Sequence, residues 1–499
     1  MRRLSPGWLA LAFALSAPQP ARAHEGDAHA GAWALPPEGS CAPAGGLRGP
    51  PPGEDAAPVP FQTGDSFSLE KMELLKSYLP AALWEYRERF FYEGMRLEIG
   101  PCFRDYSPPD FFRAATQKFA GQARLLKNGG LENHRAGLPF APESIAPDDP
   151  QAGLEWAWNV EHRYQAGGFR GRFRMTDLVG RIGRAEPFEG ELFKLQLSYR
   201  ADRAASDYEV PFARGNHWVV GGIFFEPFNA REYAWRQYRN VEHVKVARRT
   251  DDLHAYLPQW RRVRRISASD VEGVYMPSFS VGVRPSTQLV VGTGGGADAG
   301  AGGVAAAGGT GEVGGTITTK RSGFEGLELR PLLYSVEVVG VHDVLTPINA
   351  ATPAYPQAKD REFGPWGLSF ASDRWDLRRA LVLRGTLHRD VGGANLQRFE
   401  MYVDLQTLVP LYYMSYDDKN ERIDIGYYVA RWSEDRTDYP RWPDDAARPV
   451  RVLDPTGAAF ANLGEQGSWR RESWDMVSTP PDDAAVKRMI SVADLTKGR

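Results

Sequence analysis

The sequence predicts an α+β fold dominated by antiparallel β-strands. Apolar residues first recur at helix-like spacing, between about residues 69 and 126, and from about residue 155 onward they alternate with polar residues instead. Such alternation gives each strand one apolar face, which is typical of an antiparallel sheet covered on one side. The strand–helix–strand repeats of a doubly wound nucleotide-binding fold are not evident.

Composition places the chain among ordinary folded proteins. Of its 499 residues, 42% are hydrophobic and 25% are charged, which is enough apolar material for a large core and excludes a mainly disordered protein. The formal net charge is −3, so no basic field covers the whole molecule and we do not expect nucleic acid as a partner.

The first 23 residues resemble a signal peptide. Arg2 and Arg3 precede a short apolar run from Trp8 to Ala17, and Ala21-Arg22-Ala23 fits the small-x-small pattern of a cleavage site. The run is too short to span a membrane, and no later stretch is long enough, so we expect no transmembrane segment in the mature chain. We therefore predict a periplasmic protein, cleaved near Ala23; the alternative is a buried helix.

Two cysteines, Cys41 and Cys102, are the only ones in the chain. In an oxidising compartment such a pair indicates a disulfide, which would close a loop of roughly 60 residues and contribute on the order of 4 kcal/mol. The alternative is a pair of free thiols.

Helical spacing is confined to the N-terminal third. Residues 24–65 are rich in Pro, Gly and Ala and are expected to form an extended arm. A helix-like stripe from Leu69 to Leu83 is interrupted at Pro80. A second helix is expected to start at Ser107, with Pro108 in its first turn and Asp110 three residues on, and to stop at Gly129-Gly130.

Strands are expected where apolar and polar residues alternate. The segments are Leu192–Tyr199, His243–Ala247, Leu253–Leu257, Leu332–Val341, Leu381–Leu387 and Phe399–Leu405. The last of these is followed by two further alternating runs, Val409–Tyr413 and Ile423–Val429, which together predict a three-stranded meander.

Two other stretches have a distinct composition. Residues 291–316 are almost entirely Gly, Ala, Thr and Val without a phosphate-binding motif, and are interpreted as a flexible insertion. The last 60 residues carry Trp442, Trp469 and Trp474 among polar residues and are expected to form a strap over the sheet.

Catalytic and metal-binding motifs are not evident in the sequence. The nine histidines are scattered, without zinc-finger or His-Glu-x-x-His spacing, and no nucleophile elbow occurs. We therefore predict neither an enzyme nor a cofactor. One alternative concerns the new N-terminus, where His24 and His29 could chelate copper; otherwise this is a solvated tail.

Two segments are candidate binding elements. The segment Arg261-Arg262-Val263-Arg264-Arg265 is either an exposed, salt-bridged edge strand or a dock, through Arg261, Arg262, Arg264 and Arg265, for an acidic partner or lipid headgroups. The apolar stretch Trp218–Phe225 is either a core strand or a hydrophobic lip over a cavity.

The order of several motifs resembles an uncharacterised family of exported bacterial proteins that are similar to outer-membrane lipoprotein-sorting proteins and are grouped with LolA-type folds. The residues that carry the resemblance are Gly137–Phe140, Gly153, Glu155, Trp158-Asn159, Arg163-Tyr164, Ala255–Pro258 with Arg261–Arg265, Phe324–Gly326, Tyr334–Val338, Gly340, Pro347–Asn349, Trp375–Arg379, Phe399–Asp404 and Tyr416-Asp417. The Gly-rich insertion and Leu405–Leu411 depart from the family pattern.

The resemblance implies a curved, unclosed half-barrel with helices over its concave apolar face. It also implies carriage of an acyl chain or another hydrophobic molecule, in association with an RND-type inner-membrane transporter and an outer-membrane protein. We therefore predict a periplasmic carrier whose cavity is formed by Trp218, Phe224, Phe225, Tyr256, Trp260, Phe399, Met401 and Val403. A copper-binding protein and a non-catalytic envelope adaptor are the alternatives.

The expected organisation follows from these segments. It comprises a signal peptide (1–23), an extended arm (24–65), a helical segment (66–150), a ligand-carrying sheet (151–440, with the insertion 291–316) and a C-terminal strap (441–499).

Overall fold

The computed structural model describes most of the chain from residue 61 onward. The described residues are 33–42, 61–179, 187–228, 230–266, 273–275, 327–348, 361–388, 396–443, 445, 447–463 and 468–496, with four two-residue strands at 278–279, 290–291, 304–305 and 317–318. The predicted signal peptide, His24 and His29 lie outside this part of the chain, as does nearly all of the 291–316 insertion.

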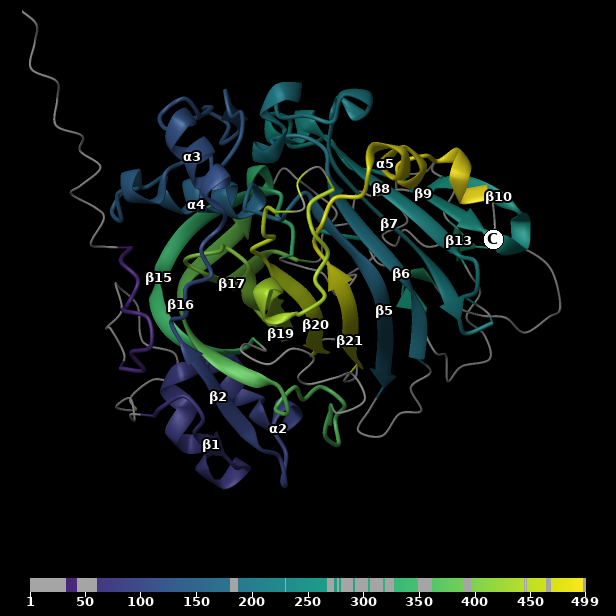
Figure 1. Cartoon of the computed structure of the whole chain (residues 1–499). Coiled ribbons are helices and arrows are strands. Elements are labelled where there is room, and N and C mark those ends of the chain that lie inside the picture. The colour runs from purple at the N-terminus through teal and green to yellow at the C-terminus, as the bar shows by residue number, and fades with distance from the viewer. Residues whose placement is uncertain are drawn as a thin grey trace, which may run out of the picture.

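A single curled sheet of 15 strands organises the molecule (Figure 1). Its order is β1-β2-β16-β17-β18-β19-β20-β21-β5-β6-β7-β8-β9-β10, and β15 also pairs with β16. All of its strand pairs are antiparallel except β2 with β16. The strands are β1 (Ser66–Phe67), β2 (Leu97–Cys102), β5 (Gly168–Val179), β6 (Pro187–Gln196), β7 (Asn216–Glu226), β8 (Ala234–Asn240), β9 (Asp252–Leu257), β10 (Arg262–Ile266), β15 (Tyr334–Pro347), β16 (Arg374–Leu387), β17 (Arg398–Asp404), β18 (Pro410–Tyr416), β19 (Arg422–Trp432), β20 (Leu453–Asn462) and β21 (Ser468–Val477). The predicted class, an α+β fold with a curved antiparallel sheet, is confirmed.

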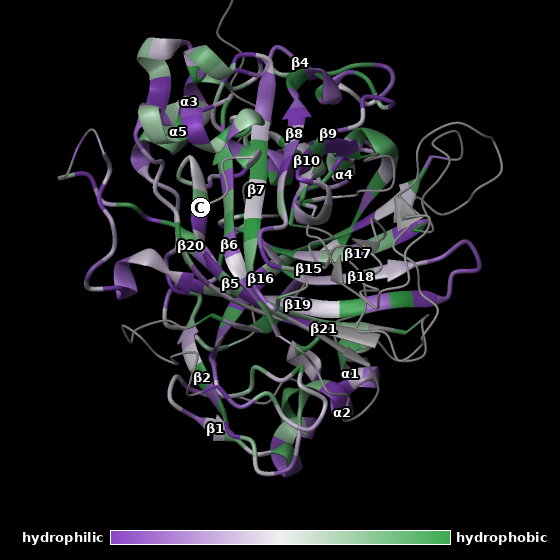
Figure 2. Ribbon diagram, turned by 90° about the vertical axis from the view of Figure 1, so that its right-hand side faces the viewer, coloured by the Kyte–Doolittle hydropathy of each residue, from purple (hydrophilic) through white to green (hydrophobic). Residues whose placement is uncertain are grey.

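Short helices lie at the two ends of the strands (Figure 2). Helices α1 (Ala81–Glu85) and α2 (Arg87–Phe90) accompany β1 and β2 at one end, after a 3-10 helix at Leu69–Tyr78. Helices α3 (Asp110–Phe119) and α4 (Ala152–Glu161) lie at the other end, and α5 (Asp483–Met489) follows the last strand.

The curl of the sheet encloses one large apolar core. Leu253 and Leu257 of β9 belong to the same buried cluster as Leu381 and Leu383 of β16, although the two strands are far apart in the strand order. Strands so distant share a core only because the sheet bends round it, so this cluster occupies the concave interior. On the opposite face of β16, Val382 packs into a second cluster with the N-terminal helical segment.

Helix α4 packs into the interior core from its end of the strands, mainly through apolar residues. Trp156, Ala157 and Val160 are fully buried in the interior cluster. A Cβ atom at Gly153 would approach the backbone oxygen of Val336 to 2.2 Å, so a glycine is needed for the helix to pack directly on β15. At the C-terminal end of α4, Glu161 accepts from Arg239 of β8 (3.2 Å) and from Trp218 of β7 (3.4 Å).

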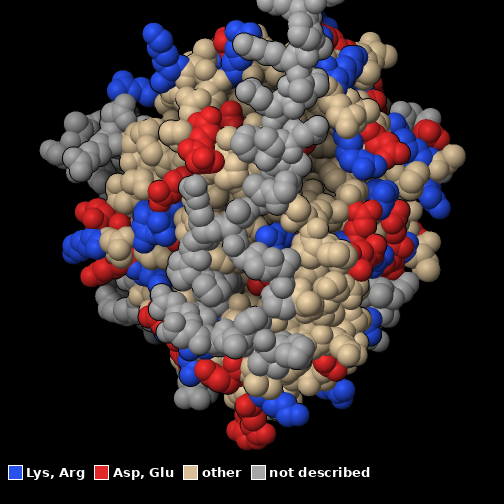
Figure 3. Space-filling view, turned by 90° about the vertical axis from the view of Figure 1, so that its left-hand side faces the viewer, with Lys and Arg blue, Asp and Glu red and all other residues tan. Residues whose placement is uncertain are grey.

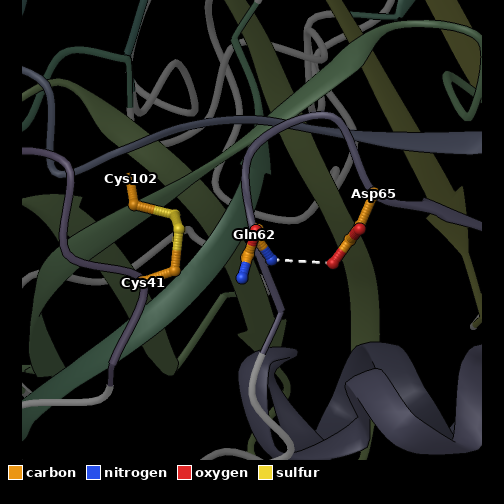
Figure 4. Close-up of a disulfide and its surroundings, with 4 residues drawn as sticks. All are labelled: Cys41, Gln62, Asp65 and Cys102. Atoms are coloured by element: carbon orange, nitrogen blue, oxygen red, sulfur yellow. Dashed lines mark hydrogen bonds between the residues drawn. A yellow bond between two sulfur atoms is a disulfide. The ribbon is translucent and has the colours of Figure 1, made fainter.

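The predicted disulfide between Cys41 and Cys102 is present (Figure 4). It joins the described part of the N-terminal arm to the end of β2, and the Gly39 amide donates to the Cys102 carbonyl at 2.8 Å beside it. Farther along the chain, the Gln62 amide donates to Asp65 at 2.7 Å in the turn that leads into β1 (Figure 4).

The meander predicted from residue 399 onward is confirmed as β17, β18 and β19. The strand predicted at His243–Ala247 is wrong, because residues Val241–Val244 form a 3-10 helix. Its first turn is capped by the side chain of Asn240, which accepts from the Glu242 amide at 2.8 Å. A local side-chain cap therefore outweighs the alternating pattern.

Two other expectations differ from the structure. The helix expected from Ser107 to Gly129 is shorter, Asp110–Phe119, and residues Arg124–Leu125 form a strand instead. It begins later because two prolines follow Ser107, whose amide instead donates to the Asp105 carboxylate. Residues 441–499, expected as a strap, contribute β20 and β21, two inner strands of the sheet. Helix α5 and the residues after it lie over β8 to β10, as a strap would (Figure 1).

Candidate functional site

The residues predicted to form the cavity are divided between the two faces of the sheet. Phe399, Met401 and Val403 of β17 point into the interior core, and each is at most 1% exposed. Trp218 and Phe224 of β7 belong to the same core and are fully buried. These five residues therefore pack against protein.

Three predicted residues lie elsewhere. Phe225 follows Phe224 on the strand, so its side chain points to the opposite face, where it is 39% exposed. Tyr256 of β9 is half-buried on that same outer face, and Trp260 packs at the margin of the interior core.

The arginine segment forms β10, the end strand of the sheet. Arg261, Arg262, Arg264 and Arg265 are all exposed. Arg265 pairs with Asp252 of the neighbouring strand, and the Arg264 guanidinium lies 5.7 Å from the ring centre of Trp260. The segment is therefore an exposed edge strand with one ion pair among its described contacts, and its guanidinium groups are accessible to solvent.

A groove of about 760 Å³ opens on the outer face of β5 to β9, beneath the C-terminal residues 488–495. Its apolar residues are Leu192, Phe193, Ile223, Ala234, Tyr256, Val477, Met489 and Leu495. Four basic residues (Arg170, Arg236, Arg436 and Arg488) and four acidic residues (Glu191, Glu232, Asp475 and Asp494) also line it. The lining is therefore apolar with balanced charges, a combination suited to an amphipathic molecule.

The C-terminal segment is held over this groove by a few specific contacts. Arg236 donates through Nε to the Met489 carbonyl at 2.6 Å, and the Tyr238 hydroxyl donates to the Ile490 carbonyl at 2.6 Å. Val486 belongs to a small apolar cluster that also contains Phe193. An ion pair between Arg203 and Asp483 of α5 (2.7 Å) is a further, partly exposed contact. Because side chains rather than a strand ladder hold the segment, we expect it to move at lower cost than an inner strand.

A second site is polar and buried, at the C-terminal end of α4. Arg239 of β8 bonds Glu161 through one guanidinium nitrogen (Nη1–Oε1 3.2 Å) and Asp251 through two others (both 3.1 Å). Beside it, Glu328 pairs with Lys194 of β6 and with Arg163. Burial lowers the pKa of Lys194 to about 8, against the opposing effect of Glu328. Burial would raise the pKa of Glu161, but Arg239 and His243 hold it well below its usual range.

Four of the nine histidines of the chain form a row beside this cluster. Ring centres are separated by 4.4 Å between His134 and His162, 4.9 Å between His162 and His217, and 4.9 Å between His217 and His243. The rings of His217 and His243 stack nearly parallel, at 15°. Burial lowers the pKa of His134, His162 and His217, so these three imidazoles are neutral near pH 7.

Glu161, His217 and His243 are the described residues that could hold a metal ion. One ligand atom from each lies within 4.8 Å of the others. Sequence analysis missed this set because the three residues come from α4, from β7 and from the capped turn that was expected to be a strand. Only the turn signal at Asn240 could have indicated where His243 lies.

The described residues contain no helix with the length and apolar character needed to cross a membrane. Charged side chains of both signs are interspersed on the side shown in Figure 3, in agreement with the formal net charge of −3.

Comparisons with known proteins give a family and a set of distant structural neighbours. Residues 70–276 match the family described as protein of unknown function (DUF1329), which confirms the resemblance to an uncharacterised family. None of the curated proteins compared with the chain matches it.

Three solved structures are similar to the chain at low identity. A DUF1329 family protein from Desulfovibrio piger is 12% identical, with 70% of this chain and 99% of that chain covered and a TM-score of 0.39. A domain from Vibrio parahaemolyticus named for outer membrane lipoprotein sorting is 14% identical (70% and 100% covered, TM-score 0.37). A LolA superfamily protein from Nitrosomonas europaea is 13% identical (67% and 96% covered, TM-score 0.30).

Proposed function

Given that residues 70–276 form a DUF1329 region, we propose that the chain is an exported, non-catalytic carrier that binds a lipid or another hydrophobic molecule in the groove on the outer face of β5 to β9. The observation that carries the proposal is the groove itself, with a volume of about 760 Å³ and an apolar floor. A volume in this range accommodates a molecule of lipid-chain size, and the charges around it can contact a polar head.

The outer groove is preferred over the concave interior because of packing. Met401, Phe399 and Trp218 are at most 1% exposed and contact other core residues, so a ligand among them would have to displace protein. A ligand in the groove has to displace only the C-terminal segment, which is attached through a small apolar cluster, hydrogen bonds and one partly exposed ion pair.

Exchange of the ligand with a membrane or a partner is assigned to the end strand β10. Its exposed arginines lie one strand away from Tyr256, which lines the groove. Cations at this position can hold an anionic headgroup or an acidic protein surface while the ligand transfers. We further propose that the chain is exported through the predicted signal peptide and works with an RND-type transporter and an outer-membrane protein. This part of the proposal rests on the family resemblance.

The test is a displacement assay with the purified full chain. Binding of 11-(dansylamino)undecanoic acid is followed by fluorescence, and oleate is used as the competitor. Ile223 lies on the groove floor, so Ile223→Glu places a carboxylate in the path of the acyl chain and is expected to weaken binding at least about tenfold.

The matched control introduces the same charge away from the groove. Val246 is 49% exposed and does not line the groove, so Val246→Glu is expected to bind like the wild type. The proposal fails if the wild-type chain does not bind the probe, or if Ile223→Glu binds it as tightly as Val246→Glu does.

A further inference from the structure

We infer that Glu161, His217 and His243 together bind one divalent transition-metal ion of the Zn²⁺ type, at a site that is separate from the groove. The inference rests on the spacing of three ligand atoms, on the hydrogen bonds of the two histidines and on the complete burial of all three side chains.

Spacing is the first argument. The Glu161 Oε1 atom lies 3.6 Å from His217 Nδ1 and 3.6 Å from His243 Nε2. These separations exceed those of ordinary hydrogen bonds. They are close to the separation of about 3.4 Å between two ligand atoms that each lie about 2.1 Å from a tetrahedral zinc ion.

The hydrogen bond of His243 is the second argument. Its Nδ1 lies 2.8 Å from the backbone carbonyl of Asn240, which can only accept, so Nδ1 carries the proton. Nε2 is then the ring nitrogen left to bind an ion, and it faces Glu161 Oε1 without a hydrogen-bond partner among the described residues. A carbonyl on the far nitrogen is the usual support of a metal-binding histidine.

The burial of His217 is the third argument. Both of its ring nitrogens are without a hydrogen-bond partner among the described residues, and its side chain is fully buried. A buried imidazole that makes no hydrogen bond loses the hydrogen bonds that it makes in water, and this loss is unfavourable. Coordination through Nδ1 supplies the missing interaction.

Charge and donor type fit such an ion. The guanidinium of Arg239 makes two hydrogen bonds to Asp251, so Glu161 is not the only counterion of Arg239. The Glu161 carboxylate can therefore also bind a metal ion. Two imidazoles and a carboxylate form a ligand set that suits zinc. Because the ligands join α4, β7 and the turn at Val241–Val244 and exclude solvent, the ion would stabilise this end of the interior.

The test uses the full chain after metal is stripped with a chelator. Zn²⁺ binding is measured by calorimetry, and Co²⁺ is used as a spectroscopic probe, because tetrahedral Co²⁺ absorbs visible light far more strongly than octahedral Co²⁺. We expect one ion per chain, a strong Co²⁺ spectrum and a higher melting temperature with Zn²⁺. His217→Ala and His243→Ala are expected to weaken binding about 100-fold or more.

Two controls separate this site from other sources of binding. His254→Ala changes a half-buried histidine on the outer face and should leave binding unchanged. The double variant His24→Ala/His29→Ala removes the N-terminal histidines and should also keep the bound ion.

The inference is overturned if the stripped wild-type chain binds no stoichiometric Zn²⁺, if the Co²⁺ spectrum is weak, or if only the N-terminal double variant loses binding. Should either buried variant fail to melt cooperatively, the stoichiometry and the Co²⁺ spectrum of the wild-type chain decide the question alone.

Discussion

Removal of the disulfide should destabilise the protein by an amount set mainly by the loop that it closes. Cys41 and Cys102 are 61 residues apart in the sequence. In the chain-entropy model, releasing a loop of this length gives back about 4 kcal/mol of conformational freedom to the unfolded state. We expect the double variant Cys41→Ser/Cys102→Ser to lose about that much free energy of unfolding, measured by urea denaturation.

The folded state should change little, because other contacts hold the N-terminal arm, including the hydrogen bond from the Gly39 amide to the Cys102 carbonyl (2.8 Å). Trp33 remains in the interior core and donates through its indole nitrogen to the Ile145 carbonyl at 2.8 Å. The near-UV circular dichroism of the variant should therefore match that of the wild type, and the reduced wild type should have the stability of the variant. A loss below about 1 kcal/mol would refute the argument, since it would mean that the unfolded chain is already compact around this loop.

Two further predictions concern buried side chains. Met401→Ala removes a fully buried side chain from the interior core and should lower the free energy of unfolding by about 2–5 kcal/mol. Its affinity for the fluorescent probe in the groove should not change. Weaker probe binding by a folded variant would place the ligand in the interior. Burial raises the pKa of Asp376 to about 8, against the hydroxyl of Tyr106, which donates to it at 2.6 Å. The folded state then keeps a proton that the unfolded chain releases above about pH 4, so stability falls as the pH rises from about 4 to 8, by at most about 1.4 kcal/mol per unit from this group. Asp376→Asn should be less sensitive to pH over that range in urea melts, and an unchanged slope would contradict the assignment.

The sheet could be predicted because its signal is local. From Phe399 to Leu405 every second residue is apolar, and the structure places Phe399, Met401 and Val403 in one core. The same kind of pattern failed at His243–Ala247, where a single side-chain cap at Asn240 decides the local conformation. Alternation therefore fails where a side-chain cap closes a helical turn within the same residues.

The two candidate sites could not be predicted because both depend on long-range contacts. The metal ligands Glu161, His217 and His243 are separated by tens of residues and meet only when α4 packs on the sheet. The groove needs α5, for which the sequence does hold a signal. Asp482 caps that helix by accepting from the Ala485 amide at 2.7 Å, a pattern that our sequence analysis did not use.

The curl of the sheet explains why a carrier of this kind would bind its ligand on the outside. Helix α4 packs into the interior core through Trp156, Ala157 and Val160, all fully buried, and this packing occupies space that an open half-barrel would offer. Opening the interior would separate α4 from β15 and also disturb the ion pairs at Glu161 and Glu328. Moving the C-terminal segment breaks a small apolar cluster, the hydrogen bonds from Arg236 and Tyr238 and the partly exposed Arg203–Asp483 ion pair, so we expect the outer groove to exchange its contents at the lower free-energy cost.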